Sequence, residues 1–262
     1  KRMLVDSHCH LNYKGIVEDQ AGVIARARDA GVGTMLGIST RAGEWDAVIG
    51  LADAHADIWA SVGIHPHEAD SHVDIDAARL IDAAAHPRVI AIGETGLDYY
   101  YNKSDHAQQQ ASFRAHIAAA RDTQLPIVIH TRDAEADTLD ILRDETGQGA
   151  FPGIIHCFTA SQSFAEQALA LGFYISLSGI VTFKNALDLQ ASARLIPDDR
   201  LLIETDSPFL APVPMRGRPC EPAFVAHTAA FLAKLRGVST EELAKTTTDN
   251  FFRLATKAVR PA

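Results

Sequence analysis

Short apolar runs rich in β-branched and aromatic residues alternate with Ala-rich amphipathic segments along the chain. The apolar runs have the length of buried strands, and the amphipathic segments carry apolar residues at helical spacing. The pattern predicts strands over residues 3–7, 33–38, 58–64, 89–94, 126–130, 153–156, 173–177 and 201–206. It predicts helices over residues 18–30, 42–54, 74–85, 105–123, 134–145, 164–171 and 187–195, and two more over 222–235 and 240–258.

Eight strand–helix units in 262 residues are typical of an α/β protein of the (β/α)8 TIM-barrel type, in which the strands are parallel. A doubly wound open sheet would usually carry a glycine-rich phosphate-binding loop after its first strand, but His8-Cys9-His10 stands there instead. No linker or repeat divides the chain. We therefore expect one domain over residues 1–262, with 222–235 closing the barrel and 240–258 packing outside it.

Composition and charge narrow the classes of function. Hydrophobic residues make up 47% of the sequence, and no apolar run approaches the roughly 20 residues that span a bilayer. The start of the chain lacks the features of a secretory signal and the three cysteines have no metal or disulfide spacing, so we expect a cytoplasmic protein with reduced thiols. The net charge of −9 argues against a broad nonspecific nucleic-acid footprint, although bound divalent cations would allow contact with phosphates at one point.

Histidines and carboxylates recur where the predicted strands end. The carboxyl ends of barrel strands build the active site, and imidazole and carboxylate groups are common metal ligands. On the first strand, His8 and His10 share one face and Cys9 takes the other. A single histidine at a strand end is more often a core residue that is hydrogen-bonded to a backbone carbonyl than a metal ligand. The recurrence of histidines and carboxylates at several strand ends, however, indicates a metal site. The residues in question are His8, His10, His65, His67, Glu94, His130, His156 and Asp206.

The number of candidate ligands favours two metal ions over one. Four imidazoles and two carboxylates exceed what one ion can accept while keeping an open coordination position. Glu94 lies between the two ends of the ligand series and has two oxygens, so it is the natural bridge. A two-metal site activates a water and stabilises both oxygens of a displacement reaction.

Six sequence blocks, in order, resemble the TatD family of metal-dependent deoxyribonucleases, a branch of the amidohydrolase-like barrels. The blocks are DSHCHL at 6–11, GIHPH at 63–67, GETGLDY at 93–99, HTRDA at 130–134, IHCF at 155–158 and ETDSPFL at 204–210. The resemblance extends from Asp6 to the NFFRL segment at 250–254, which is nearly the whole chain. It implies a TIM-type barrel and a divalent-metal hydrolase acting on DNA phosphodiesters, with exonuclease activity.

The resemblance also implies roles for individual residues. His8, His10, Glu94 and Asp206 would bind one metal, and Glu94, His130 and His156 the other. Asp206 would also orient the attacking water and accept its proton, so that Asp206, Glu94 and His65 form the catalytic set. His65 would donate to a phosphate oxygen; the alternative for His65 and His67 is a rigid His-Pro-His turn with exposed imidazoles.

Further candidates for substrate contacts lie near the strand ends, each with an open alternative. Arg132 either binds a phosphate or pairs with Asp133 or Glu135. Arg216 and Arg218 either contact a phosphate or belong to a solvated loop. The aromatic run at 99–101 either stacks on a base or packs against a helix. The chain reads Cys220-Glu221-Pro222 where the family usually has Asn-Glu-Pro, which affects only local hydrogen bonds.

We therefore expect a hydrolase that cleaves DNA phosphodiesters with a metal-activated water and two divalent ions, Mg, Mn or Zn. Its partner would be DNA, as a single strand or a strand end, with no membrane involved. One alternative is an amide, lactone or aminoacyl-ester hydrolase of the same superfamily, which would be favoured by a lysine on the fourth strand where this chain has Glu94. The other alternative is a metal-loaded binding protein without catalytic activity.

Overall fold

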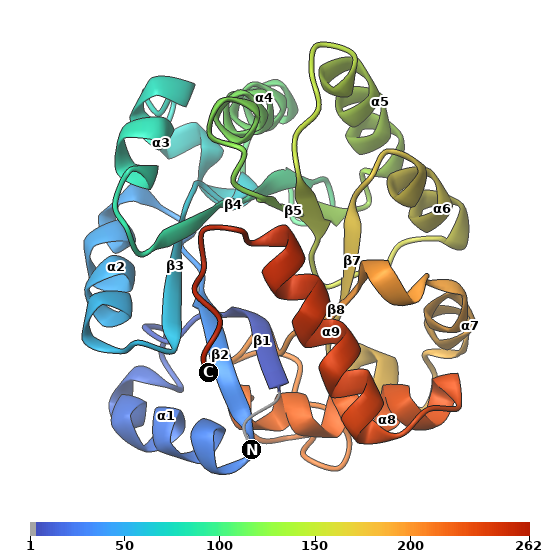
Figure 1. The fold of residues 1–262 in the computed structure, drawn as a ribbon. Helices are drawn as coiled ribbons and strands as arrows, with labels where there is room; N and C mark the ends of the chain where they lie inside the picture. The colour runs from blue at the N-terminus through green and yellow to red at the C-terminus, as the bar shows by residue number, and fades with distance from the viewer. Residues whose placement is uncertain (1–3) are drawn as a thin grey trace.

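The computed structural model describes residues 4–262, and eight parallel strands in this part of the chain form one sheet in the order β1 to β8 (Figure 1). The strands are β1 (Leu4–Cys9), β2 (Val32–Gly37), β3 (Ile58–Val62), β4 (Val89–Asp98), β5 (Ile127–Arg132), β6 (Gly153–Ile155), β7 (Tyr174–Leu177) and β8 (Leu201–Ile203). The main helices are α1 (Gln20–Asp29), α2 (Trp45–Ala54), α3 (Ala77–Ala84), α4 (His106–Thr123), α5 (Glu135–Thr146), α6 (Gln162–Ala170), α7 (Leu187–Leu195), α8 (Val225–Arg236) and α9 (Thr240–Leu254). None of the helices in the described part of the chain is long and apolar enough to cross a bilayer.

The two ends of the sheet meet between β1 and the segment that follows β8. A parallel bridge joins Cys9 to Ser207. The backbone N–H of His10 donates to the carbonyl of Ser207 at 2.9 Å, and the N–H of Asp206 donates to the carbonyl of His8 at 2.8 Å. The eight strands thus form a nearly closed barrel surrounded by helices, which confirms the predicted TIM-type fold.

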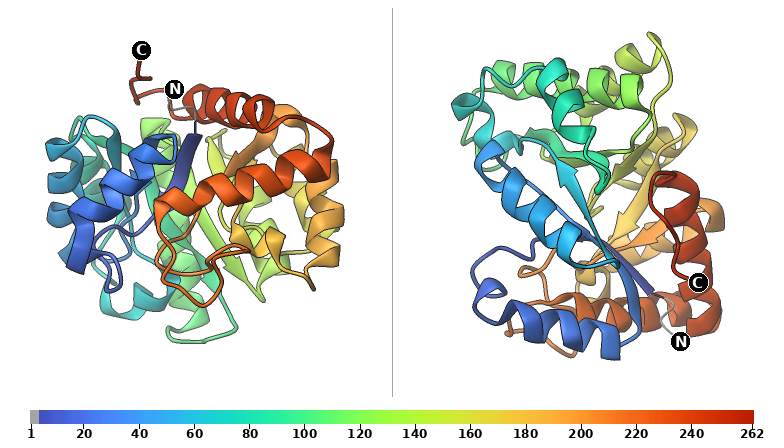
Figure 2. Two further views of the ribbon diagram at one scale, coloured as in Figure 1. Left: turned by 90° about the horizontal axis from the view of Figure 1, so that it is seen from below. Right: turned by 60° about the vertical axis from the view of Figure 1, so that its left-hand side comes forward.

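Two apolar clusters hold the barrel together. The larger cluster lies between strands and helices and includes Cys9 of β1. The smaller cluster gathers Val5, Leu36 and Val128 from three strands with Phe251 and Leu254 of α9. This last helix packs outside the ring of strands, as expected, but the prediction did not say where: α9 lies across one end of the strands and contributes apolar side chains to the smaller cluster (Figures 1 and 2).

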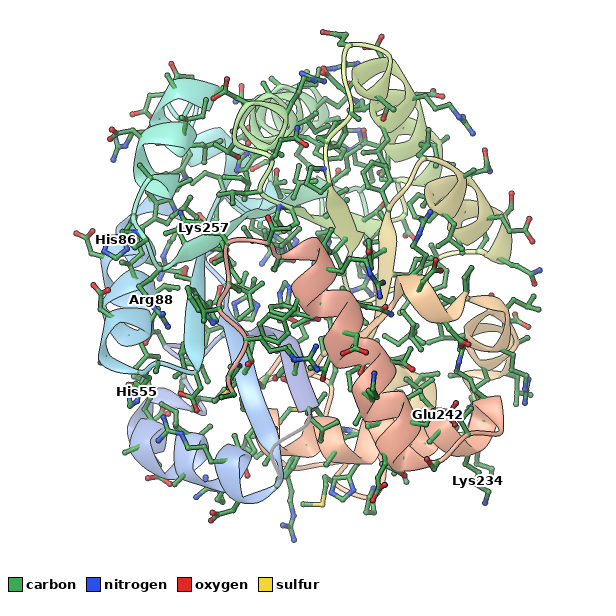
Figure 3. The ribbon with its side chains drawn as sticks, in the orientation of Figure 1. His55, His86, Arg88, Lys234, Glu242 and Lys257 are labelled. Atoms are coloured by element: carbon green, nitrogen blue, oxygen red, sulfur yellow. The ribbon has the colours of Figure 1, made fainter. Side chains whose placement is uncertain are left out.

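Two basic side chains near this covered end, those of Arg88 and Lys257, bind backbone carbonyls. Arg88 lies 3.7 Å from the centre of the Trp59 ring and donates to the carbonyls of Ala52 and His55 at 3.0 Å each. The ammonium of Lys257 donates to the carbonyls of Ala84 and His86 at 2.9 Å each; Arg88, His86 and Lys257 are labelled in Figure 3. These contacts tie α2, α3 and the segment after α9 to this end of the barrel, opposite the end that holds the ligand candidates.

Two strands, β4 and β8, end three or more residues from the predicted position. The sequence suggests a loop after Glu94, but β4 continues to Asp98 because its ladder with β5 resumes after a register shift between Gly93 and Thr95. Conversely, β8 ends at Ile203, and the chain beyond it turns toward β1. The predicted first residue of β1, Met3, lies outside the described residues.

Candidate metal centre and active site

A pocket of about 220 Å³ at the carboxyl ends of the strands is lined by six of the eight histidines and carboxylates predicted at strand ends. Because all strands of a parallel barrel end at the same mouth, the polar side chains that end β1, β4 and β5 converge there. The pocket is lined by His10, Tyr13, Thr40, His65, His67, Glu68, Glu94, His130, Asp206 and Phe209.

Glu94 lies at the centre of the cluster, with its two oxygens facing different sets of histidines. Oε1 is 3.1 Å from Nε2 of His8 and 3.8 Å from Nε2 of His10. Oε2 is 3.2 Å from Nδ1 of His130 and 2.9 Å from Nε2 of His156. Oε1 thus faces His8 and His10, and Oε2 faces His130 and His156.

The backbone around Glu94 requires glycine. At Gly96 the φ angle is +129°, and a Cβ there would overlap the carbonyl of His130 on the neighbouring strand. A Cβ at Gly63 would likewise overlap the backbone of Gly93. Together with the register shift in β4, these close approaches direct the Glu94 side chain into the pocket.

Asp206 completes the half of the site that β1 contributes. Its Oδ1 is 3.3 Å from Nε2 of His8 and 3.2 Å from Nε2 of His10, and these two nitrogens are 3.3 Å apart. Asp206 has a φ of +57°, which turns the chain sharply after β8. A register shift in β1 between Asp6 and Cys9 directs His8 and His10 to the pocket, while Cys9 packs in the larger apolar cluster between strands and helices.

Two buried carboxylates behind the histidines have no role assigned from the sequence. Oδ2 of Asp98 is 2.8 Å from Nε2 of His130, and Oε1 of Glu204 is 2.8 Å from Nδ1 of His156. A carboxylate behind a metal-binding histidine fixes its tautomer and its orientation. The spacing carried a signal for both: Asp98 follows Glu94 by four residues, and Glu204 precedes Asp206 by two.

The charges of the cluster compensate one another. Burial alone would raise the pKa of Glu94, but the facing imidazoles, His156 foremost, hold that pKa well below its usual range. Burial would also raise the pKa of Asp206, but hydrogen bonds from His10 and His8 lower it. Both carboxylates are therefore ionised at neutral pH, and the cluster offers two negative charges to a cation.

The donor set fits divalent metal ions. Four overlapping groups place ligand atoms within 4.8 Å of one another, and each contains at least one histidine nitrogen and at least one carboxylate oxygen. Imidazole and carboxylate together suit Zn²⁺ or Mn²⁺, and carboxylates suit Mg²⁺. The groups are His8, Glu94 and His156; His8, His10 and Asp206; His65, Glu94 and His130; and His156, Glu204 and Asp206. No cysteine belongs to these groups among the described residues.

His65 and His67 combine features of both predicted alternatives. The turn is fixed, because Nδ1 of His65 accepts a hydrogen bond from the backbone N–H of His67 at 3.0 Å. The imidazoles nevertheless face the site: Nε2 of His65 is 3.3 Å from Oε2 of Glu94, and Nε2 of His67 is 3.2 Å from Oδ2 of Asp98. Burial lowers the pKa of His65 to about 4, so its imidazole is neutral at pH 7.

The candidate arginines lie at different places around the mouth. Arg132 follows His130 on β5 and lies 4.0 Å from the centre of the Tyr100 ring; among the described residues it pairs with neither Asp133 nor Glu135. Arg216 lies 3.9 Å from the centre of the Phe183 ring and lines a separate hollow of about 360 Å³ together with Lys184.

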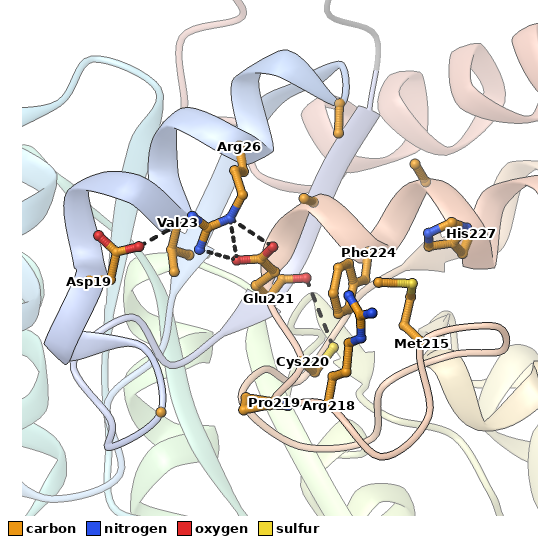
Figure 4. A pocket seen from close by; sticks show the side chains of 14 residues that line it. Asp19, Val23, Arg26, Met215, Arg218, Pro219, Cys220, Glu221, Phe224 and His227 are labelled. Carbon is orange, nitrogen blue, oxygen red and sulfur yellow. Dashed lines mark hydrogen bonds and ion pairs between the residues drawn. The ribbon is translucent and has the colours of Figure 1, made fainter.

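Arg218 belongs to a larger hollow on the outside of the barrel. This hollow, of about 800 Å³, lies between α1 and the segment before α8 (Figure 4). Its main charges neutralise one another, because the guanidinium of Arg26 donates to Glu221 at 2.9–3.1 Å and to Asp19 at 3.2 Å. The family glutamate at position 221 thus fastens the loop to α1, and the chemistry of the site is concentrated in the smaller pocket.

Comparisons with known proteins agree with this geometry. The family model described as TatD related DNase matches residues 5–256. The uncharacterized metal-dependent hydrolase YcfH of Escherichia coli K12 is 46% identical over 256 residues, which cover 96% of this chain and 95% of that protein. The 3'-5' ssDNA/RNA exonuclease TatD of Pantoea vagans is 38% identical over 261 residues, which cover 96% and 100%. The crystal structure of the TatD homologue YjjV from Escherichia coli K12 superposes with a TM-score of 0.90 at 27% identity, covering 97% and 98%. Because the family match extends over nearly the whole chain, the protein belongs to the TatD-related DNase family of metal-dependent hydrolases.

Proposed function

We propose that the protein hydrolyses DNA phosphodiester bonds from a strand end, using two divalent ions in one barrel domain. The observation that carries the proposal is the division of Glu94, whose Oε1 faces His8 and whose Oε2 faces His130 and His156. A nuclease of this kind needs positive charge near both the attacking and the leaving oxygen of the phosphate, and a shared carboxylate holds two metal ions close together. The exonuclease name of the Pantoea vagans relative supports this choice of substrate.

The chain's own residues would hold the ions in two sets. We assign His8, His10, Glu94 and Asp206 to one ion, and Glu94, His130 and His156 to the other. When bound, the ions supply a water of lowered pKa and positive charge for the oxygens of the phosphate. Asp98 and Glu204 position His130 and His156 from behind.

Asp206 and His65 would handle protons and substrate oxygens. The lowered pKa of Asp206 keeps its carboxylate ionised, so it can accept the proton of the attacking water. His65 is neutral, and its Nδ1 accepts from the His67 backbone, so its proton is on Nε2, which faces the pocket. From there it can donate to a phosphate oxygen.

Basic side chains outside the pocket would contact neighbouring phosphates. Arg132 lies nearest, because it follows His130 by two residues on β5. Arg216 and Lys184 line the hollow of about 360 Å³. Arg218 lines a different hollow, so only a strand that runs beyond the metal pocket would reach it.

Hydrolysis of end-labelled single-stranded DNA tests the proposal. The protein is stripped of metal, and Mg²⁺, Mn²⁺ or Zn²⁺ is then supplied in turn. We expect stepwise shortening that requires metal, with a loss of at least about 100-fold in rate for Asp206→Asn, because the proton acceptor becomes neutral. Asp140→Asn is the matched control, since the Asp140 side chain is 76% exposed on α5.

The same experiment can reject the proposal. If wild-type protein that binds metal fails to cleave DNA with any of the three ions, the phosphodiesterase assignment is wrong. Amide and ester substrates would then be tried, because they suit the same ligand set.

A further inference from the structure

Two exposed tyrosines stand beside the metal pocket. Tyr100 and Tyr101 are 56% and 51% exposed, and their rings are perpendicular with centres 4.8 Å apart. Tyr99 differs from both, because its ring stacks on His106 at 3.7 Å and its hydroxyl donates to Asp137 at 2.7 Å. The ring and hydroxyl of Tyr99 are thus both bound within the protein, whereas Tyr100 and Tyr101 remain about half exposed.

Arg132 lies in the corner formed by the two exposed rings. Its guanidinium carbon is 4.0 Å from the centre of the Tyr100 ring and 4.9 Å from that of Tyr101. Stacking on an aromatic ring holds a guanidinium flat and leaves its N–H groups at the edge. No acidic side chain among residues 4–262 pairs with Arg132, and Glu135 instead accepts from the hydroxyl of Ser161 at 2.6 Å. An oriented guanidinium without a protein anion suits a phosphate.

This corner is continuous with the metal pocket. The Tyr101 ring lies edge-on to the His67 ring, with centres 5.4 Å apart, and His67 lines the pocket. Arg132 lies on the same face of β5 as His130, two residues farther along. Oδ1 of Asp98 accepts from the backbone N–H groups of Tyr100 and Tyr101 at 3.1 and 2.9 Å. Since Oδ2 of Asp98 bonds His130, one carboxylate fixes both the ligand and the aromatic loop.

We propose that Tyr100, Tyr101 and Arg132 form a nucleotide-binding subsite next to the metal pocket. Arg132 pairs with the phosphodiester adjacent to the one that is cleaved, and an exposed tyrosine face stacks on the base that this phosphodiester carries. The proposal rests on the proposed nuclease function and adds a preference for unpaired bases, because a base in a duplex cannot stack on a side chain.

The test compares two substrates and two kinds of variant. One substrate is a 5'-fluorescein-labelled oligothymidylate, and the other is the same strand with an abasic residue next to the terminal nucleotide. The double variant Tyr100→Ala/Tyr101→Ala removes the rings, and Tyr100→Phe/Tyr101→Phe retains them as the matched control. Binding is measured by fluorescence polarisation in EDTA, and KM and kcat are measured with metal; the Tm of each variant verifies folding.

We expect the alanine pair to raise KM and Kd for oligothymidylate roughly 10- to 100-fold, with kcat changed by less than about threefold. The phenylalanine pair should resemble the wild type. On the abasic strand, wild type and alanine pair should be alike, since no base remains to stack. Arg132→Ala should weaken binding of both strands equally, because both keep the phosphate.

Two results would overturn the subsite, and they are distinguishable. If the wild type cleaves DNA and the alanine pair has unchanged KM and Kd, the subsite is wrong and the nuclease function stands. If the wild type neither binds nor cleaves either strand, the nuclease function and the subsite both fail.

Discussion

At the scale of single residues, the site depends on groups behind the candidate ligands as much as on the ligands. Asp98 bonds His130 through Nε2, which leaves Nδ1 to face Glu94. Asp6 accepts from the N–H and the hydroxyl of Thr205 at 2.9 and 2.6 Å, and so links β1 to the segment that carries Asp206. Small displacements of these buried groups would move ligand atoms directly.

Replacing Asp98 by asparagine should weaken the binding of one metal ion. The amide no longer enforces the tautomer of His130, so we expect a loss of about 10- to 100-fold in affinity for the metal ion that we assign to His130. Calorimetric metal titration measures this affinity. Asp133→Asn, at an exposed position on the loop after β5, serves as control, and equal affinities in both variants would refute the role of Asp98.

His116 should make the stability of the fold depend on pH. It is fully buried, its Nε2 accepts from the N–H of Ile64 at 2.9 Å, and burial lowers its pKa from 6.5 to about 4. The unfolded chain binds a proton below pH 6.5 while the folded chain does not until about pH 4. The contribution of neutral His116 to the free energy of unfolding is therefore present above pH 6.5 and is lost as the pH falls toward 4.

We expect the titration of His116 to lower the free energy of unfolding by about 2 kcal/mol between pH 7 and pH 5. Urea unfolding of wild type and His116→Gln across this range measures it, since the variant lacks the titrating group. The two curves of unfolding free energy against pH should converge at low pH. Parallel curves would show that His116 is not the group responsible.

At the scale of elements, α9 covers the end of the barrel opposite the site. Phe251 is 1% exposed and packs with Val5, Leu36 and Val128 of the strands. Phe251→Ala should lower the free energy of unfolding by about 3–5 kcal/mol, because it leaves a cavity in a core that cannot close around it. Metal content should stay the same. Urea unfolding measures the loss, and Val259→Ala, at a 72% exposed position, should cost less than about 0.5 kcal/mol. A loss for Phe251→Ala as small as that of the control would contradict this role of α9.

The helices and strands also show how much of the fold could be predicted from the sequence. Periodicity was sufficient for the eight strands and their order, because each strand is a short apolar run followed by an amphipathic helix. It failed at the end of β4, because a strand that carries Gly96 and a polar Asp98 resembles a loop unless its ladder with β5 is known. It also did not place α9 at the end of the barrel, because amphipathicity indicates that a helix has a buried face but not where that face packs.

Within the site, strand-end position was sufficient to nominate the histidines, Glu94 and Asp206, and the structure brings them together. The backing carboxylates Asp98 and Glu204 escaped, since their role follows from which imidazole nitrogen each one faces. The partner of Arg132 could not be predicted either. Proximity in the sequence suggested Asp133 or Glu135, but Arg132 stacks on the tyrosine rings of the loop that follows β4. Such choices depend on side-chain direction, which one sequence does not encode in a readable way.

At the scale of the whole molecule, the net charge of −9 limits how the proposed DNA substrate could be bound. With binding concentrated at the metals and a few arginines, the slope of log Kd against log salt for single-stranded DNA should correspond to fewer than about three released ions. Polarisation titrations from 50 to 300 mM salt measure this slope. Arg132→Ala should reduce the slope by less than about one, and a wild-type slope above about five would indicate an extended basic surface instead.

Counting the metal ions bound per chain is the sharpest test of the two-metal site. After equilibration with Mn²⁺ or Zn²⁺ and removal of free metal, elemental analysis should find two ions in the wild type, one in His10→Ala and one in His130→Ala. The double variant His10→Ala/His130→Ala should retain almost none, because its two replacements remove ligands from different ions. One ion in the wild type, or one ion retained in the double variant, would contradict the division of the site around Glu94.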